Sequence, residues 1–82
     1  MERQDVISKL RSFICAELLG EPDYPLGESE ELITGGLIDS LSLAQIGVFV
    51  EEAFDVYIHD NDLTVERMNT LAKMADAIVA GA

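Results

Sequence analysis

Apolar residues recur at helical spacing along several segments of the chain. The spacing over residues 5–19 predicts an amphipathic first helix, which Gly20 ends and the nearby Pro22 and Pro25 do not allow to resume. The apolar positions of this segment are Val6, Ile7, Leu10, Phe13, Ile14 and Leu18.

A long polar segment, residues 20–39, follows the first helix and is rich in glycine and acidic residues. A connection of this length in a small domain needs apolar anchors, and long loops in compact domains are often functional. The sequence allows one short helical turn within it, at residues 29–32. The predicted anchors are Leu32, Ile33, Leu37 and Ile38.

A second helix is predicted over residues 40–54, with Asp39 as its N-cap. We expect one face to be buried and the opposite face to be exposed. The expected buried face comprises Leu43, Ile46, Gly47, Val50 and Phe54, and the exposed one Leu41, Gln45, Val48 and Glu52. Gly47 is costly inside a helix, by about 1 kcal/mol relative to Ala. It fits either close helix packing or space for a bound chain between helices.

Two further helices complete the pattern. Residues 60–62, an Asp-Asn-Asp run, are predicted to cap a short helix over residues 63–66, and Asn69 to cap a last helix over residues 70–80. The prediction is a single all-α domain over residues 1–82. It is a small four-helix bundle of three longer helices and one short helix, with a long loop between the first and second helices.

Charge narrows the choice of partners. The chain has 16 acidic and 5 basic residues and a net charge of -11, and residues 12–66 contain no Lys or Arg. Nucleic acid and anionic membranes would be repelled, whereas basic protein surfaces would be attracted. The same charge favours a monomer. The simpler alternative is that the acidity only provides solubility.

The cellular location and the reaction class are constrained mainly by the absence of disulfide pairs, long apolar segments and catalytic motifs. The single cysteine, Cys15, cannot form an internal disulfide, and there is no apolar run at the start of the chain or long enough to cross a bilayer. We therefore expect a cytoplasmic protein without membrane insertion. His59 is the only histidine, and the glycines around Ser40 do not have the spacing of a nucleophile elbow. His59 and Cys15 alone cannot build a zinc site, so we expect neither catalysis nor a metal.

The distinctive segment is Gly35-Gly36-Leu37-Ile38-Asp39-Ser40-Leu41-Ser42-Leu43. It puts a hydroxyl in the first turn of a helix, directly after a glycine-rich loop. A phosphodiester attached to Ser40 would lie beside free backbone amides at the positive end of the helix dipole. Leu41 would be exposed next to it.

These residues resemble the signature of the acyl carrier proteins. The match consists of Asp39-Ser40-Leu41 after a glycine-rich loop and a helix that ends Glu51-Glu52-Ala53-Phe54-Asp55, and it extends in size, acidity and helix lengths over the whole chain. The resemblance implies that a phosphopantetheinyl transferase attaches 4'-phosphopantetheine from coenzyme A to Ser40, with Asp39 assisting recognition. The arm would hold acyl, ketide or aminoacyl groups as thioesters, and the carrier itself would perform no chemistry.

The resemblance also implies that loading and processing enzymes dock on the second helix through their own basic patches. The implied partner-binding residues are Leu41, Gln45, Val48, Glu51 and Glu52. Typical fatty-acid carriers have acids shortly after the modified serine, where this chain has Ser42 and Gln45. This departure favours a specialised stand-alone carrier. Fatty-acid, polyketide, lipid-modification and aminoacyl pathways stay open, and Asp39 counts only against the peptide-synthetase class. Two alternatives from other classes are an acidic helical interaction module without a prosthetic group and a hydrolase that uses Ser40 and His59.

Overall fold

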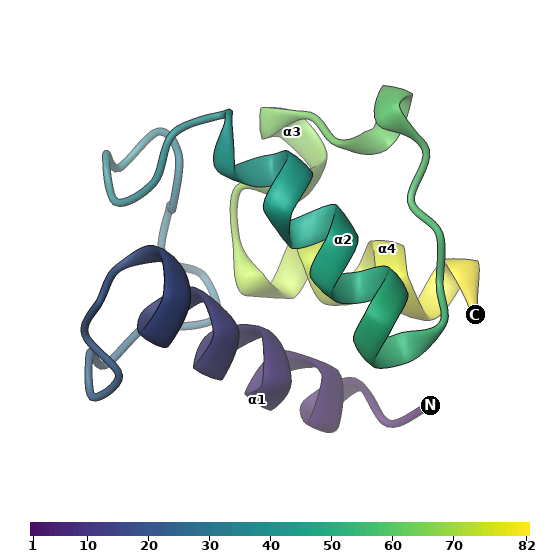
Figure 1. Cartoon of the computed structure of the whole chain (residues 1–82), viewed down its shortest axis with the longest axis horizontal. Coiled ribbons are helices and arrows are strands. Elements are labelled where there is room, and N and C mark those ends of the chain that lie inside the picture. Colours follow the sequence, from purple (N-terminus) through teal and green to yellow (C-terminus); the bar gives the residue numbers. More distant parts are fainter.

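The computed structural model describes all 82 residues, and its regular elements are all helical. This confirms the predicted all-α class. Figure 1 shows α2 crossing in front of α4, with α1 running beneath them. The elements are α1 (Arg3–Phe13), the π-helical η1 (Ile14–Leu18), α2 (Ser42–Phe54), the 3-10 helix η2 (Asp60–Asp62), α3 (Val65–Met68) and α4 (Leu71–Gly81).

The first predicted helix is present as α1 and its continuation η1. Val6, Ile7, Leu10 and Ile14 are buried, as their spacing predicts. Gly20 follows with φ +68, a left-handed conformation that glycine adopts without the steric cost of a Cβ. The helix therefore ends where the sequence indicates.

The core is almost entirely aliphatic. Its 18 apolar residues come from every helix except η2 and from the loops, and no aromatic side chain is among them. They are Val6, Ile7, Leu10, Ile14, Cys15, Leu26, Leu32, Ile38, Leu43, Ile46, Val50, Val56, Ile58, Met68, Leu71, Met74, Ala75 and Ile78. The chain's phenylalanines instead pack against this core from outside.

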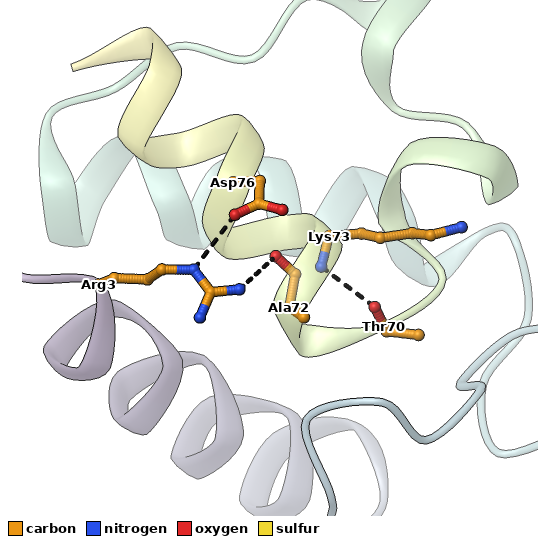
Figure 2. Close-up of polar contacts among 5 residues, drawn as sticks. All are labelled: Arg3, Thr70, Ala72, Lys73 and Asp76. Carbon is orange, nitrogen blue, oxygen red and sulfur yellow. Dashed lines mark hydrogen bonds and ion pairs between the residues drawn. The ribbon is translucent and has the colours of Figure 1, made fainter.

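Helices α1 and α4 are neighbours and also make polar contacts at their solvent edge. Arg3 Nε donates to Asp76 Oδ1 over 3.2 Å, and Arg3 Nη2 donates to the Ala72 carbonyl over 3.5 Å (Figure 2). The two charged side chains are 41% and 70% exposed, so solvent screens the pair and we expect it to add little to stability. Burial of the aliphatic side chains holds these helices together.

The caps of the last two helices differ from the prediction. Thr64, not residues 60–62, caps α3 by accepting from the Arg67 amide, and α3 begins at Val65. Residues 60–62 form their own 3-10 turn and are not in a position to cap α3. Thr70, not Asn69, caps α4 by accepting from the Lys73 amide over 3.1 Å (Figure 2). Both threonines have the extended backbone that directs an N-cap hydroxyl toward the amide three residues on.

Asn69 has a different role, because its side chain is buried against the long loop. Its Oδ1 accepts from the amides of Ile33 (2.9 Å) and Thr34 (3.1 Å), and its Nδ2 donates to Thr34 Oγ1 over 2.9 Å. Its backbone carbonyl accepts from the Leu32 amide over 2.8 Å. One residue between α3 and α4 thus satisfies three consecutive backbone amides of the loop.

No helix is assigned between Leu18 and Ser42, so the helical turn allowed at residues 29–32 does not form. The predicted anchors do hold this segment, since Leu32 and Ile38 are buried and Ile33 and Leu37 pack against the core. A further buried anchor, Leu26, was not predicted. Its carbonyl accepts from Arg11 Nε over 2.8 Å.

The glycine inside α2 lies against a neighbouring side chain. A Cβ added at Gly47 would be 3.2 Å from Leu63 Cδ1 and 3.5 Å from Leu63 Cδ2. The contact favours the close-packing interpretation of Gly47, because even one added carbon would require Leu63 to shift.

Candidate modification site and the exposed face of α2

Ser40 lies in a tight turn that leads into α2. Its carbonyl accepts from the Leu43 amide over 3.2 Å, and regular α-helix begins at Ser42, two residues later than predicted. Asp39 caps this turn, whereas the N-cap position of α2 itself is Leu41, which makes no side-chain capping bond. Asp39 Oδ1 accepts from the Ser42 amide (3.1 Å) and from Ser42 Oγ (3.3 Å).

The segment before Ser40 is fixed by backbone contacts. The amides of Leu37 and Ile38 both donate to the Leu32 carbonyl, over 2.9 and 3.0 Å. Gly36 has φ +81, and a Cβ added at Gly35 would lie 2.2 Å from the Glu31 carbonyl oxygen. Only glycine fits both positions without strain. Because Asn69 holds Leu32, Ile33 and Thr34, the approach to Ser40 is anchored to the α3–α4 junction.

The Ser40 hydroxyl is available to solvent. The residue is exposed and its Oγ makes no hydrogen bond within the protein. The backbone amides of Ser40 and Leu41 also have no acceptor, whereas the Ser42 amide is shared by the carbonyl and the carboxylate of Asp39. Two free amides therefore flank the hydroxyl, but Asp39 already occupies part of the positive end of the helix.

The predicted partner-binding residues lie on the surface of α2 and the turn before it. Leu41 is 80% exposed and Val48 58% exposed, so both offer apolar surface to solvent. Gln45, Glu51 and Glu52 are exposed too. Val48 and Glu51 border a hollow of about 210 Å³, whose other lining residues are Ala44, Gly47, Tyr57, Ile58, Asp60 and Leu63.

The residues of the hydrolase alternative are not joined. No hydrogen bond connects Ser40 with His59, whose ring packs edge-on against Tyr57 with the centroids 5.0 Å apart. Nor do three His, Cys, Asp or Glu side chains converge at a position that could hold a metal ion. None of the helices combines the length and the apolar content needed to span a bilayer.

Two groups with altered pKa values lie away from Ser40. A hydrogen bond of 2.5 Å to Glu30 Oε2 raises the pKa of Tyr24 above its ordinary value of 10.0, and burial adds to the effect. Burial raises the pKa of the Cys15 thiol above 9.0, partly opposed by the nearby Arg11 guanidinium. Both groups lie near the first turns of the long loop rather than at the candidate site.

Sequence reasoning missed two features of the molecule. One is the attachment of the loop by Asn69, because an Asn just before a helix has the ordinary signature of an N-cap. The other is the cluster of Phe13, Phe49 and Phe54 between α1 and α2. The available signal was that Phe49, a large aromatic residue, lies on neither of the two expected faces of the second helix, but its ring partner on α1 is distant in sequence.

Comparison of the sequence with protein-family models and with curated proteins gave no match.

Proposed function

We propose that this protein is a carrier of acyl, ketide or aminoacyl intermediates, held as thioesters on a 4'-phosphopantetheine arm attached to Ser40. The observation that carries the proposal is the environment of Ser40. An exposed serine with an unengaged hydroxyl precedes a 13-residue helix, beside a capping aspartate and after a fixed glycine turn. The resemblance of Asp39-Ser40-Leu41 and its surroundings to the acyl carrier proteins supports the same function.

The residues at Ser40 are compatible with the prosthetic group. The hydroxyl would form the phosphodiester bond, and the free amides of Ser40 and Leu41 suit a neighbouring phosphate. When bound, the arm supplies the thiol that carries the cargo. The chain's own contribution is to hold Ser40 on a fixed turn and to leave the surrounding surface open to enzymes.

Enzymes that load or process the cargo would dock on α2. Leu41 and Val48 offer exposed apolar contact, and Glu51 and Glu52 offer carboxylates to basic patches. The neutral Ser42 and Gln45 support a specialised stand-alone carrier with its own partners. A thioester on such an arm reaches successive active sites at high effective concentration. The proposed setting is the cytoplasm, with the carrier as a monomer.

The direct test is the intact mass of the protein before and after incubation with coenzyme A and a broad-specificity phosphopantetheinyl transferase. We expect wild type and Ser42→Ala to gain one phosphopantetheine group and Ser40→Ala to gain none. Ser42→Ala is the matched control, because it removes the neighbouring hydroxyl and leaves Ser40 in place. No gain on folded, initially unmodified wild type would contradict the carrier function and favour an acidic interaction module without a prosthetic group.

A further inference from the structure

The phenylalanines of this chain form a surface cluster. There are three in the sequence, and all three meet between α1 and α2. The rings of Phe13 and Phe49 are stacked, with centroids 4.3 Å apart and planes 12° from parallel, and Phe54 meets Phe49 edge-on at 6.0 Å. Each is only half-buried, although aromatic rings have the most apolar area to gain by burial. The aliphatic core leaves them on the surface.

Two adjoining hollows make a groove along this cluster. One has a volume of about 510 Å³ and the other about 370 Å³, and both are lined by Phe13, Glu17 and Phe49. We call the pair the phenylalanine groove. It is bordered on α1 by Ser8, Lys9 and Ser12, on η1 by Ala16, and on α2 by Gln45, Val48, Glu52 and Ala53.

The groove combines aromatic rings with carboxylates. Glu17 comes from the helix η1 and Glu52 from α2, and both are exposed. At the other end, Lys9 Nζ lies 5.8 Å from the ring centroid of Phe54, so one ring of the cluster already contacts a cation. A guanidinium can stack flat on an aromatic face and can also pair with a carboxylate through two parallel hydrogen bonds. An ammonium can lie over a ring but cannot make the bidentate pair. The groove therefore offers the groups that recognise arginine next to an apolar side chain.

We propose that the phenylalanine groove binds an amphipathic helix of a partner protein, with an apolar side chain against Phe13 and Phe49 and an arginine beside Glu17 and Glu52. The charge of the chain selects this occupant. Lys9 is the one basic residue that lines the groove, no Lys or Arg occurs between Ser12 and Glu66, and a second copy of the chain would bring its own net charge of -11. Aromatic side chains and arginine are also the residues most enriched at the energetic centres of protein interfaces. The groove shares Gln45, Val48 and Glu52 with the face of α2 proposed for docking enzymes, but it does not require modification of Ser40, so binding to the groove is tested separately from that modification.

The first experiment is an NMR titration of the Ser40→Ala protein with three synthetic helical peptides of equal length. All three have the same leucine face, and they carry arginine, lysine or glutamate beside it. We expect the arginine peptide to bind most tightly and to shift the ring resonances of Phe13 and Phe49. Equal affinity of the arginine and lysine peptides, shifts confined to other surfaces, or no binding would each overturn the proposal.

The second experiment separates the groove from the general acidity. The double variant Glu17→Lys/Glu52→Lys is compared with Glu2→Lys/Glu66→Lys, in which two exposed acids elsewhere are replaced and the net charge changes equally. Loss of the groove carboxylates should weaken the arginine peptide about tenfold, and the control about twofold, because the control alters only the overall field. All four positions are exposed, so both proteins should fold, which circular dichroism checks.

Two results would overturn the proposal, one from the double variants and one from a companion measurement. Equal weakening in the two double variants would show that the peptide responds only to net charge. Sedimentation equilibrium of the free protein provides the companion measurement. A dimer that protects Phe13 and Phe49 would show that the groove is an interface between copies of this chain. Because the titration uses Ser40→Ala, a failure to bind the arginine peptide says nothing about modification of Ser40. In the same way, a failure of Ser40 to be modified says nothing about peptide binding to the groove.

Discussion

Similar side chains before helices serve different purposes in this chain, and the local backbone decides which. Asp39 accepts from the Ser42 amide and caps the turn that leads into α2. Asn69 has a helical backbone and turns its amide group away from α4, so its side chain meets the loop, while the extended Thr70 takes the cap. The sequence supports the cap interpretation for both residues. For Asn69, the deciding contact lies 36 positions away in the chain.

Replacement of Asn69 tests this assignment. Asn69→Ala leaves the amides of Ile33 and Thr34 without their acceptor in a partly buried site, and we expect a loss of about 2–3 kcal/mol in the free energy of unfolding. The measurement is urea denaturation, together with amide hydrogen exchange of Ile33 and Thr34, which should accelerate.

Two control variants separate this role from helix capping. Asn69→Asp keeps the acceptor oxygens and should cost less than Asn69→Ala, whereas Thr70→Ala should cost about 1 kcal/mol as a lost cap. If Asn69→Ala left the exchange of both loop amides unchanged, the attachment of the loop by Asn69 would be refuted.

At the scale of elements, the segment between η1 and α2 has its own fixed structure without a helix. Its buried anchors were predictable from apolar residues within a polar stretch, since Leu32 and Ile38 have few alternatives to burial. The exact path of the segment was not predictable. That path depends on backbone and side-chain pairs such as Arg11 with the Leu26 carbonyl and Tyr24 with Glu30, which join positions of no fixed spacing.

The Tyr24–Glu30 pair makes this segment sensitive to alkaline pH. The hydrogen bond to Glu30 raises the pKa of Tyr24 above 10.0, and burial raises the pKa of Cys15 above 9.0. Each group holds its proton more tightly in the folded chain than in the unfolded chain. The stability that each contributes is therefore complete below its ordinary pKa and is lost as the pH rises through the folded-state pKa.

We thus expect the free energy of unfolding to fall as the pH rises above about 9. Urea denaturation over a series of pH values measures this change. Tyr24→Phe should flatten the upper part of the decline, above about pH 10, and leave the part due to Cys15. An identical pH dependence in wild type and Tyr24→Phe would count against the hydrogen bond as the cause.

At the scale of the whole molecule, the net charge of -11 is large for a protein of 82 residues. The principal extents are 28, 24 and 20 Å, while the Debye length is about 30 Å at 0.01 M ionic strength and about 10 Å at 0.1 M. At low salt, acidic groups on opposite faces therefore repel one another across the protein. The two ion pairs, Arg3–Asp76 and Arg67–Asp62, are exposed and do not offset this repulsion.

The expected consequence is that sodium chloride stabilises the fold. Raising the ionic strength from about 0.01 M to about 0.3 M should increase the free energy of unfolding, because screening weakens the self-repulsion more than it weakens the exposed pairs. Urea denaturation at several salt concentrations measures the change. The variant Glu2→Gln/Glu66→Gln, with two fewer exposed charges, should respond less. Stability that fell with added salt would show that the attractive pairs dominate.

The sequence by itself determined the helical class, the positions of α1, α2 and α4 to within a few residues, most of the buried face of α2, and Ser40 as the candidate site. These follow from local periodicity, turn residues and a contiguous motif, all of which act over short stretches of chain. Only the tertiary structure decided that Asn69 fixes the loop before Ser40 and that Phe13 meets Phe49 in a surface groove. Both depend on residues 36 positions apart, whose contact follows from how the helices and the loop pack and not from any local spacing.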